Sequence, residues 1–175
     1  MTPGTFRRLV VLRHAKSAWP DVPDSERPLA PCGRREAPAA GRWLREADCV
    51  PDLVVCSSAR STRETWDLVA AELGAAPAPV IYEARLYGAS AGDLLGVVRE
   101  VPAQVRTLML IGHNPGVQEL VLLLAGEADG YVLEQTRTKF PTSAIAVLRA
   151  PGPWGSLEAG ASRLTDMVVP RGANP

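Results

Sequence analysis

The chain contains two histidines, and each one follows a short apolar run that is typical of a buried strand. His14 comes just after the run Leu9–Leu12. His113 stands in the same place after the run Leu108–Ile111. In open α/β sheets, ligands bind outside the carboxyl ends of the strands, so residues that follow two different strands can meet in one pocket. The two histidines are therefore predicted to form a paired site, and the alternative is that each is an ordinary packed or exposed histidine.

Arg13 places a guanidinium group directly beside His14. A guanidinium can hold two phosphate oxygens in parallel hydrogen bonds. The imidazole is mostly neutral near pH 7, so its nitrogen can attack phosphorus and form a covalent intermediate that divides a difficult displacement into two easier steps. This pair therefore indicates phosphoryl transfer, unless Arg13 is only a surface ion-pair partner.

Short β-branched runs alternate along the chain with longer stretches of helical spacing, which is typical of βαβ units and a mostly parallel sheet. The predicted fold class is therefore α/β. Pro38 must lie in the first turn of a helix over Gly33–Ala47 or kink that helix. The other expected helices are Ser61–Leu73, Gly92–Arg99 and Gly116–Ala125, and the expected strands are Leu9–Leu12, Leu53–Cys56, Val80–Tyr82, Leu108–Ile111 and Ala144–Leu148, with terminal strands around Ser156–Ala159 and Leu164–Val169.

Length and composition set the limits of the prediction. No repeat, linker or change of composition divides residues 1–175, which we expect to form a single domain. Nineteen basic and nineteen acidic residues balance, which argues against nucleic acid or an anionic membrane as a partner. Cys32, Cys49 and Cys56 lack Cys-x-x-Cys spacing, so neither a disulfide framework nor a structural zinc site is expected. The apolar runs are too short to cross a bilayer and the N-terminus lacks a signal-like run, so we expect a cytoplasmic protein.

An ordered series of short blocks resembles the histidine phosphatase superfamily, whose members begin with a strand followed by Arg-His-Gly or a close variant. In this chain the third position of that motif is Ala15. A single Arg-His pair occurs by chance in many proteins, whereas an ordered series with a second strand-end histidine is specific. The blocks are Arg13-His14-Ala15-Lys16-Ser17, Arg27-Pro28-Leu29 with Gly33-Arg34-Arg35, Cys56-Ser57-Ser58-Ala59, Gly112-His113-Asn114-Pro115-Gly116 and Phe140-Pro141-Thr142-Ser143-Ala144.

This resemblance implies a three-layer α/β/α fold with a mostly parallel central sheet, as in phosphoglycerate mutase. The start of the chain and the Arg-Pro-Leu block look most like the SixA-type phosphohistidine phosphatases. The resemblance makes His14 the nucleophile, Arg13 a phosphate ligand and His113 a second phosphate-pocket residue, positively charged in the complex. Lys16 and Ser17 are candidates for the rim of the pocket. The resemblance implies neither a metal nor an organic cofactor.

One element of the family pattern is out of register. The family places a Ser, then an Arg four residues later, then a Thr four residues after that. With Ser57 and Thr65 as the two ends, the arginine position holds Ser61, and the arginine is Arg60. One residue rotates a helix by about 100°, so Arg60 points elsewhere unless the loop or helix register adjusts. Arg60 is still the first candidate for the second phosphate arginine, ahead of Arg63, and the alternative is a solvated arginine at a helix start.

A second departure concerns the substrate. Family members that cleave alkyl phosphates carry a glutamate general acid two residues beyond a leucine that follows a strand. Counting from Leu86 gives Gly88, while Glu83 lies nearby in a different register. An alkoxide needs a proton as it leaves, whereas an imidazole, with a reference pKa of about 6.5, departs more easily. The missing acid agrees with a phosphohistidine substrate. Glu83 is a candidate acid, with a surface carboxylate as the alternative.

The predicted function is hydrolysis of protein phosphohistidine through a phosphorylated His14. Two alternatives within the family stay open: a phosphatase for a small phosphate ester, and a catalytically weakened, phosphate-binding regulatory relative, which the displaced Arg60 would explain. A metal site built on His14 and His113 ranks last, because neither has a carboxylate or thiolate companion close by in the sequence. The sequence fixes neither the phosphorylated partner nor the oligomeric state.

Overall fold

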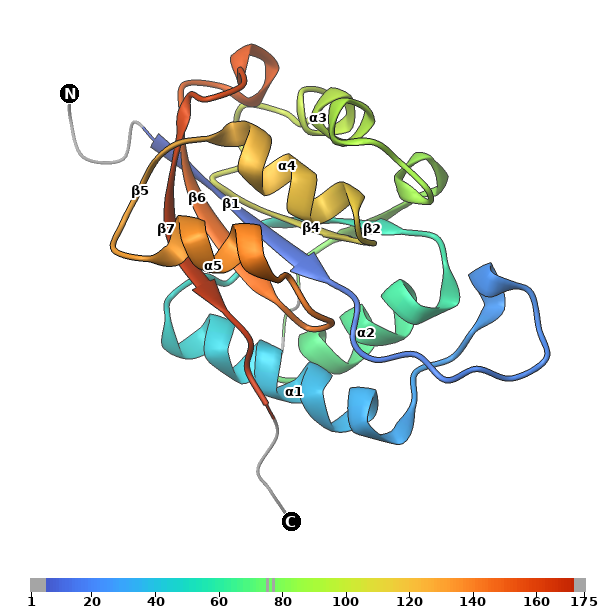
Figure 1. The fold of residues 1–175 in the computed structure, drawn as a ribbon. Coiled ribbons are helices and arrows are strands. Elements are labelled where there is room, and N and C mark those ends of the chain that lie inside the picture. Colours follow the sequence, from blue (N-terminus) through green and yellow to red (C-terminus); the bar gives the residue numbers. More distant parts are fainter. Residues whose placement is uncertain (1–5, 75, 77, 172–175) are drawn as a thin grey trace.

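The computed structural model describes residues 6–74, 76 and 78–171, which form a seven-stranded sheet with helices on both faces (Figure 1). The strand order is β3-β2-β4-β1-β6-β7-β5. Strands β1 to β4 pair in parallel, as do β5 and β7, and only β6 pairs antiparallel with its neighbours. The predicted α/β class with a mostly parallel sheet is confirmed. The strands are β1 (Phe6–Arg13), β2 (Leu53–Ser57), β3 (Val80–Glu83), β4 (Thr107–Gly112), β5 (Ala125–Ala128), β6 (Ile145–Pro151) and β7 (Ser162–Val168).

The helices form two layers, one on each face of the sheet (Figure 1). Successive side chains of a strand point to opposite faces. In β1, Leu9 and Val11 therefore pack toward α3, α4 and α5, while Val10 and Leu12 pack toward α1 and α2. All four side chains are fully buried, as expected for a strand covered on both sides. The helices are α1 (Pro31–Glu46), α2 (Arg60–Ala70), α3 (Ala91–Val98), α4 (Gly116–Leu124) and α5 (Val132–Thr138), with short 3-10 turns η1 (Asp24–Glu26), η2 (Ala84–Leu86) and η3 (Trp154–Ser156).

Most of the elements expected from the sequence are present, with small shifts at their ends. The expected strand around Ser156–Ala159 is wrong, because Ser156 is the last residue of η3 and the residues after it form a loop that ends in a turn. The sequence analysis missed β5 and α5. Strand β5 has the sequence Ala-Gly-Glu-Ala, which lacks both the β-branched residues and the alternation that mark a strand. Within the described residues, no helix has the length and apolar character needed to cross a membrane.

Helix α1 begins earlier than predicted. Its first residue is Pro31, a position where proline is favoured because the first helical N–H has no partner inside the helix. Pro38 therefore lies within the helix and not in its first turn. Helix α1 still buries a continuous stripe of small and apolar side chains, which include Ala37, Ala40 and Leu44. Packing of this stripe on the sheet outweighs the unfavourable effect of proline inside a helix.

The pairing of three parallel strands brings distant residues to one edge of the sheet. Arg13 at the end of β1 lies opposite Gly112 at the end of β4. On the other side of β4, Cys56 of β2 lies opposite Ile111. The residues at the carboxyl ends of β1, β4 and β2 therefore gather at the same edge.

The loop after β1 is held against the start of α1. The N–H of Ala30 donates to the carbonyl of Lys16 at 2.8 Å. Gly33 lies so close to the same group that a Cβ atom on it would be 2.2 Å from the Lys16 carbonyl oxygen. Only glycine permits this approach, because it has no Cβ. The first turn of α1 thus fixes the backbone that follows His14.

Replacing Gly33 with alanine is expected to lower the free energy of unfolding by about 1–3 kcal/mol, because the new methyl group must displace backbone atoms. Gly96→Ala is the matched control, since Gly96 lies in α3 with open space where a Cβ would be. That change should stabilise the protein by up to about 1 kcal/mol, the usual helix preference for alanine over glycine. Urea unfolding measures both values. Equal stability of Gly33→Ala and wild type would contradict the close approach.

Candidate active site

His14 and His113 lie side by side at the carboxyl edge of the sheet. Their ring centroids are 5.2 Å apart, with a tilt of 54° between the ring planes. The backbone N–H of His14 donates to the carbonyl of Gly112 at 3.1 Å, which continues the pairing of β1 with β4. Both rings line a cavity of about 410 Å³. The paired arrangement expected from the sequence is thus present, and it arises from the strand register.

One nitrogen of the His14 ring is left without a proton. Nδ1 of His14 lies 2.7 Å from the carbonyl oxygen of Ala15. A carbonyl oxygen only accepts, so Nδ1 carries the ring proton and Nε2 keeps its lone pair. Burial lowers the pKa of His14 to about 4, and the positive charges of Arg13 and Arg27 act in the same direction. At neutral pH His14 is therefore an uncharged imidazole with a free Nε2, which is the form that can act as a nucleophile.

Two buried hydroxyl groups support the histidines. Thr65 Oγ1 of α2 accepts a hydrogen bond from the N–H of Ala15 at 3.0 Å and so holds the loop that follows His14. Ser57 Oγ at the end of β2 forms a 2.8 Å hydrogen bond with Nε2 of His113. Burial lowers the pKa of His113 and Arg13 adds to this effect, whereas the negative charge of Asp24 opposes it.

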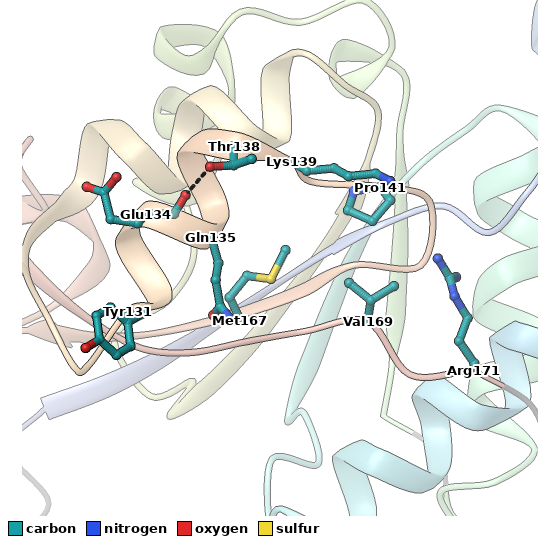
Figure 2. A pocket seen from close by; sticks show the side chains of 9 residues that line it. All are labelled: Tyr131, Glu134, Gln135, Thr138, Lys139, Pro141, Met167, Val169 and Arg171. Carbon is teal, nitrogen blue, oxygen red and sulfur yellow. Dashed lines mark hydrogen bonds between the residues drawn. The ribbon is translucent and has the colours of Figure 1, made fainter.

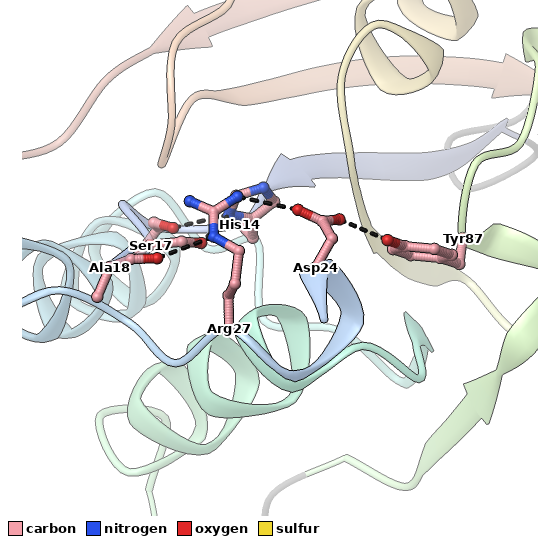
Figure 3. Close-up of polar contacts among 7 residues, drawn as sticks. His14, Ser17, Ala18, Asp24, Arg27 and Tyr87 are labelled. Carbon is pink, nitrogen blue, oxygen red and sulfur yellow. Dashed lines mark hydrogen bonds and ion pairs between the residues drawn. The ribbon is translucent and has the colours of Figure 1, made fainter. Parts of the chain in front are cut away.

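Two arginines line the cavity and give it positive charge. Arg13 donates from Nη1 to the carbonyl of Phe140 at 3.0 Å, while its buried Nε has no hydrogen-bond partner among the described residues. Arg27 donates from Nε to the carbonyl of Ala18 at 2.8 Å (Figure 3). The guanidinium of Arg27 also stacks on the ring of Trp19, 3.3 Å from its centroid. Two guanidinium groups beside a neutral imidazole suit a bound phosphoryl group.

Asp24 and Tyr87 complete the wall beside His113. The hydroxyl of Tyr87 donates a short hydrogen bond to Asp24, and Arg27 donates to the same carboxylate at 3.0 Å (Figure 3). These two bonds hold the pKa of Asp24 below its usual value. The ring of Tyr87 meets that of His113 edge-on, with centroids 5.2 Å apart. Asp24 is therefore an ionised carboxylate that fixes Arg27 in place.

The structure does not bring Arg60 into this cavity. Arg60 is the first residue of α2, and its exposed side chain donates from Nε to Glu64 at 2.8 Å. The next residue, Ser61, is buried, as the rotation of about 100° per residue requires. The adjustment of register that would have turned Arg60 inward has not occurred. Arg27 lines the cavity instead, and its place in the Arg-Pro-Leu block was the sequence signal for it.

Glu83 also lies outside the cavity. Strand β3 is at the edge of the sheet, and the Glu83 carboxylate accepts from both the N–H and the guanidinium of Arg85. The carboxylate that does line the cavity is Asp24, which no strand or motif marked in advance. Among the described residues, no group of three or more His, Cys, Asp or Glu side chains is placed to hold a metal ion.

Comparison with known proteins finds relatives that cover more than nine-tenths of the chain. A model of the histidine phosphatase superfamily (branch 1) matches residues 9–116. An uncharacterized protein of Mycobacterium tuberculosis is 44% identical over 163 residues, which cover 91% of this chain and 100% of that protein. The structure of a proposed phosphohistidine phosphatase SixA from Nakamurella multipartitia has a TM-score of 0.83 at 32% identity and covers 94% of this chain and 96% of its own. A second proposed SixA, from Agrobacterium tumefaciens, gives 0.78 at 27% identity, with 94% and 98% covered.

The ring of His14 is expected to titrate in an NMR experiment with a pKa of about 4, because the folded chain buries it. In the unfolded chain its pKa is about 6.5. Between these two values the unfolded chain binds more protons, so the contribution of His14 to the free energy of unfolding falls as the pH is lowered from 6.5 toward 4. The free energy of unfolding of wild type, measured relative to that of His14→Gln, should therefore decrease as the pH is lowered from 6.5 to 4. A His14 titration near 6.5 would contradict the burial.

Proposed function

The chain belongs to the histidine phosphatase superfamily, and we propose that it is a SixA-type phosphohistidine phosphatase that hydrolyses protein phosphohistidine. The observation that carries the proposal is the neutral His14 with a free Nε2, in a cavity that Arg13 and Arg27 also line. The names of the two similar SixA structures support the same class of substrate.

In the first step, the lone pair of His14 Nε2 attacks the phosphorus of the substrate. The substrate N–P bond breaks and its electron pair stays on the substrate imidazole. A phosphohistidine whose other ring nitrogen is protonated leaves as a neutral imidazole, so no acid is needed at the breaking bond. Arg13 and Arg27 neutralise the phosphoryl oxygens, which remain negatively charged in the transition state.

In the second step, a water oxygen attacks the phosphorus of phosphorylated His14. The P–Nε2 bond breaks, its electron pair returns to Nε2, and the water proton passes to a phosphate oxygen or to solvent. The Ala15 carbonyl holds the proton on Nδ1 throughout, so His14 also leaves as a neutral imidazole. The phosphoryl oxygens favour a protonated His113, which then stabilises them by charge.

The acid–base groups of the cavity favour phosphohistidine over an alkyl phosphate. Among the described residues that line the cavity, Asp24 is the one carboxylate. The hydrogen bonds from Tyr87 and Arg27 keep its pKa low, so it is ionised at neutral pH and has no proton to donate. An alkoxide leaving group needs such a proton, whereas an imidazole does not. Activity on a small phosphate ester is therefore the second candidate.

Rapid phosphate release from a phosphohistidine peptide and slow release from an alkyl phosphate such as glycerol 3-phosphate, whose alkoxide needs a proton as it leaves, are expected for the wild-type protein. His14→Gln should remove both activities, because it removes the attacking nitrogen. Rapid acid-free quenching should trap a phosphoenzyme that is labile in acid and stable in base, as a phosphorylated histidine is. Mapping of the phosphate to His14 by mass spectrometry checks the intermediate.

Other outcomes of this experiment separate the alternatives. Rapid release from esters with little release from phosphohistidine would favour the small-ester phosphatase. Binding of inorganic phosphate in a calorimeter without turnover or a phosphoenzyme would favour a non-catalytic relative. Either outcome would overturn the proposal.

Arg27→Gln is expected to lower kcat on phosphohistidine by about a hundredfold, the usual effect of removing one donor to a charged transition state. Arg60→Gln is the matched change, and it should alter kcat by less than about twofold, because an exposed ion pair such as Arg60 with Glu64 contributes little. Steady-state kinetics and circular dichroism on both variants distinguish lost chemistry from lost folding. A large loss in Arg60→Gln together with a small loss in Arg27→Gln would show that the helix arginine is the phosphate ligand.

A further inference from the structure

Two further cavities lie next to the candidate active site, along α5 and the end of β7. The first has a volume of about 420 Å³ and shares Arg13, Lys16 and Thr142 with the cavity of the histidines. The second has a volume of about 620 Å³ and shares Lys139 and Pro141 with the first. The two cavities are therefore adjacent to each other and to the cavity of the histidines, and we call the two together the α5 groove.

The end of the α5 groove nearest to His14 is basic. Arg13, Lys16 and Lys139 line it, and no carboxylate does so among the described residues. The ammonium groups of Lys16 and Lys139 are on exposed side chains and form no ion pair or hydrogen bond within the described part of the chain. Positive charge without a partner on the protein is complementary to an acidic ligand.

The exposed surface at the far end of the groove is mainly apolar. Figure 2 shows the side chains that line it. Met167 and Val169 are half-buried at the edge of the main core and leave part of their surface open to the groove. Tyr131, just before α5, is 82% exposed beside them. The carboxylate that lines this end, Glu134, is bonded to Arg137. An exposed tyrosine beside a half-buried methionine is typical of surfaces that bind polypeptides.

We propose that the α5 groove binds the polypeptide segment next to the phosphohistidine of a protein substrate. An acidic side chain of that segment lies at Lys16 and Lys139, and an apolar side chain packs on Met167 and Val169. This inference rests on the proposed function. The residues that line both the groove and the cavity of the histidines support it, because a phosphohistidine bound beside His14 places its neighbouring residues next to the groove. A free phosphate ester has no chain to extend there.

The inference predicts a preference among phosphohistidine substrates. The probes are short synthetic phosphohistidine peptides with Glu and Leu on either side of the modified residue, peptides with Lys and Ser in those places, and free phosphohistidine. The Glu/Leu peptides should have a KM at least about tenfold lower than the Lys/Ser peptides, with similar kcat, because the groove contributes binding and not chemistry.

Lys139→Glu tests the charge of the groove, since Lys139 lies outside the cavity of the histidines. This variant should lose the preference for the Glu/Leu peptides and favour the Lys/Ser peptides, while its rate on free phosphohistidine stays as in wild type. Arg35→Glu carries the same change of charge at an exposed position of α1 that lines neither the groove nor the cavity of the histidines, so it should keep the preference. Tyr131→Ala should raise KM only for peptides that contain Leu.

The remaining outcomes separate failure of the groove from failure of the proposed function. If wild type hydrolyses all peptides and free phosphohistidine with equal kcat/KM, the groove inference is overturned and the proposed function stands. If it hydrolyses esters but no phosphohistidine substrate, the proposed function fails and the inference fails with it. Sedimentation that finds a dimer in wild type and a monomer in Tyr131→Ala would assign the groove to a second copy of the chain and also overturn the inference.

Discussion

The parallel pairing of β1 with β4 is the constraint on which the candidate site depends. Neighbouring strands lie about 4.8 Å apart, so the first residues beyond a paired Arg13 and Gly112 must come into contact. The centroid separation of 5.2 Å between His14 and His113 follows from this register. A slip of one residue would turn the side chains of β4 to the opposite face and separate the two rings. The central residues of β1 and β4 are fully buried on both faces of the sheet, so such a slip would disrupt their packing and is unfavourable.

Burial and charge act together on the histidines. The chain as a whole has no net charge, yet Arg13, Arg27 and Lys16 converge on one cavity with Asp24 as the opposing group. Burial and the nearby arginines keep His14 uncharged, while the carbonyl of Ala15 decides which nitrogen holds the proton. A local positive field and a neutral nucleophile are the two properties that an in-line attack on a phosphoryl anion requires. The fold supplies both without a metal-binding cluster among the described residues.

The second arginine of the site comes from a loop and not from the start of α2. Arg27 is held by the carbonyl of Ala18, the ring of Trp19 and the carboxylate of Asp24, which Tyr87 holds in turn. Its position therefore depends on contacts between segments far apart in the chain. Beyond this loop, the cavity is adjacent to the basic end of the α5 groove and shares Arg13 and Lys16 with it.

The sequence by itself determined the α/β class and the main strands, because strand periodicity is a local property of the chain. It predicted from their strand-end positions that His14 and His113 meet, but the pairing of β1 with β4 that brings them together is a tertiary contact. The one-residue shift of Arg60 indicated that its side chain rotates away, yet Arg60 was the first candidate for the second phosphate arginine, and the structure leaves it outside the cavity. Only the tertiary structure decided that Glu83 pairs with Arg85 at a sheet edge and that Asp24 and Arg27 line the cavity. Strand β5 likewise exists through its pairing with β7 and not through its own residues. Ion pairs and loop positions depend on which distant groups come within reach, and the sequence pattern around each residue does not contain that information.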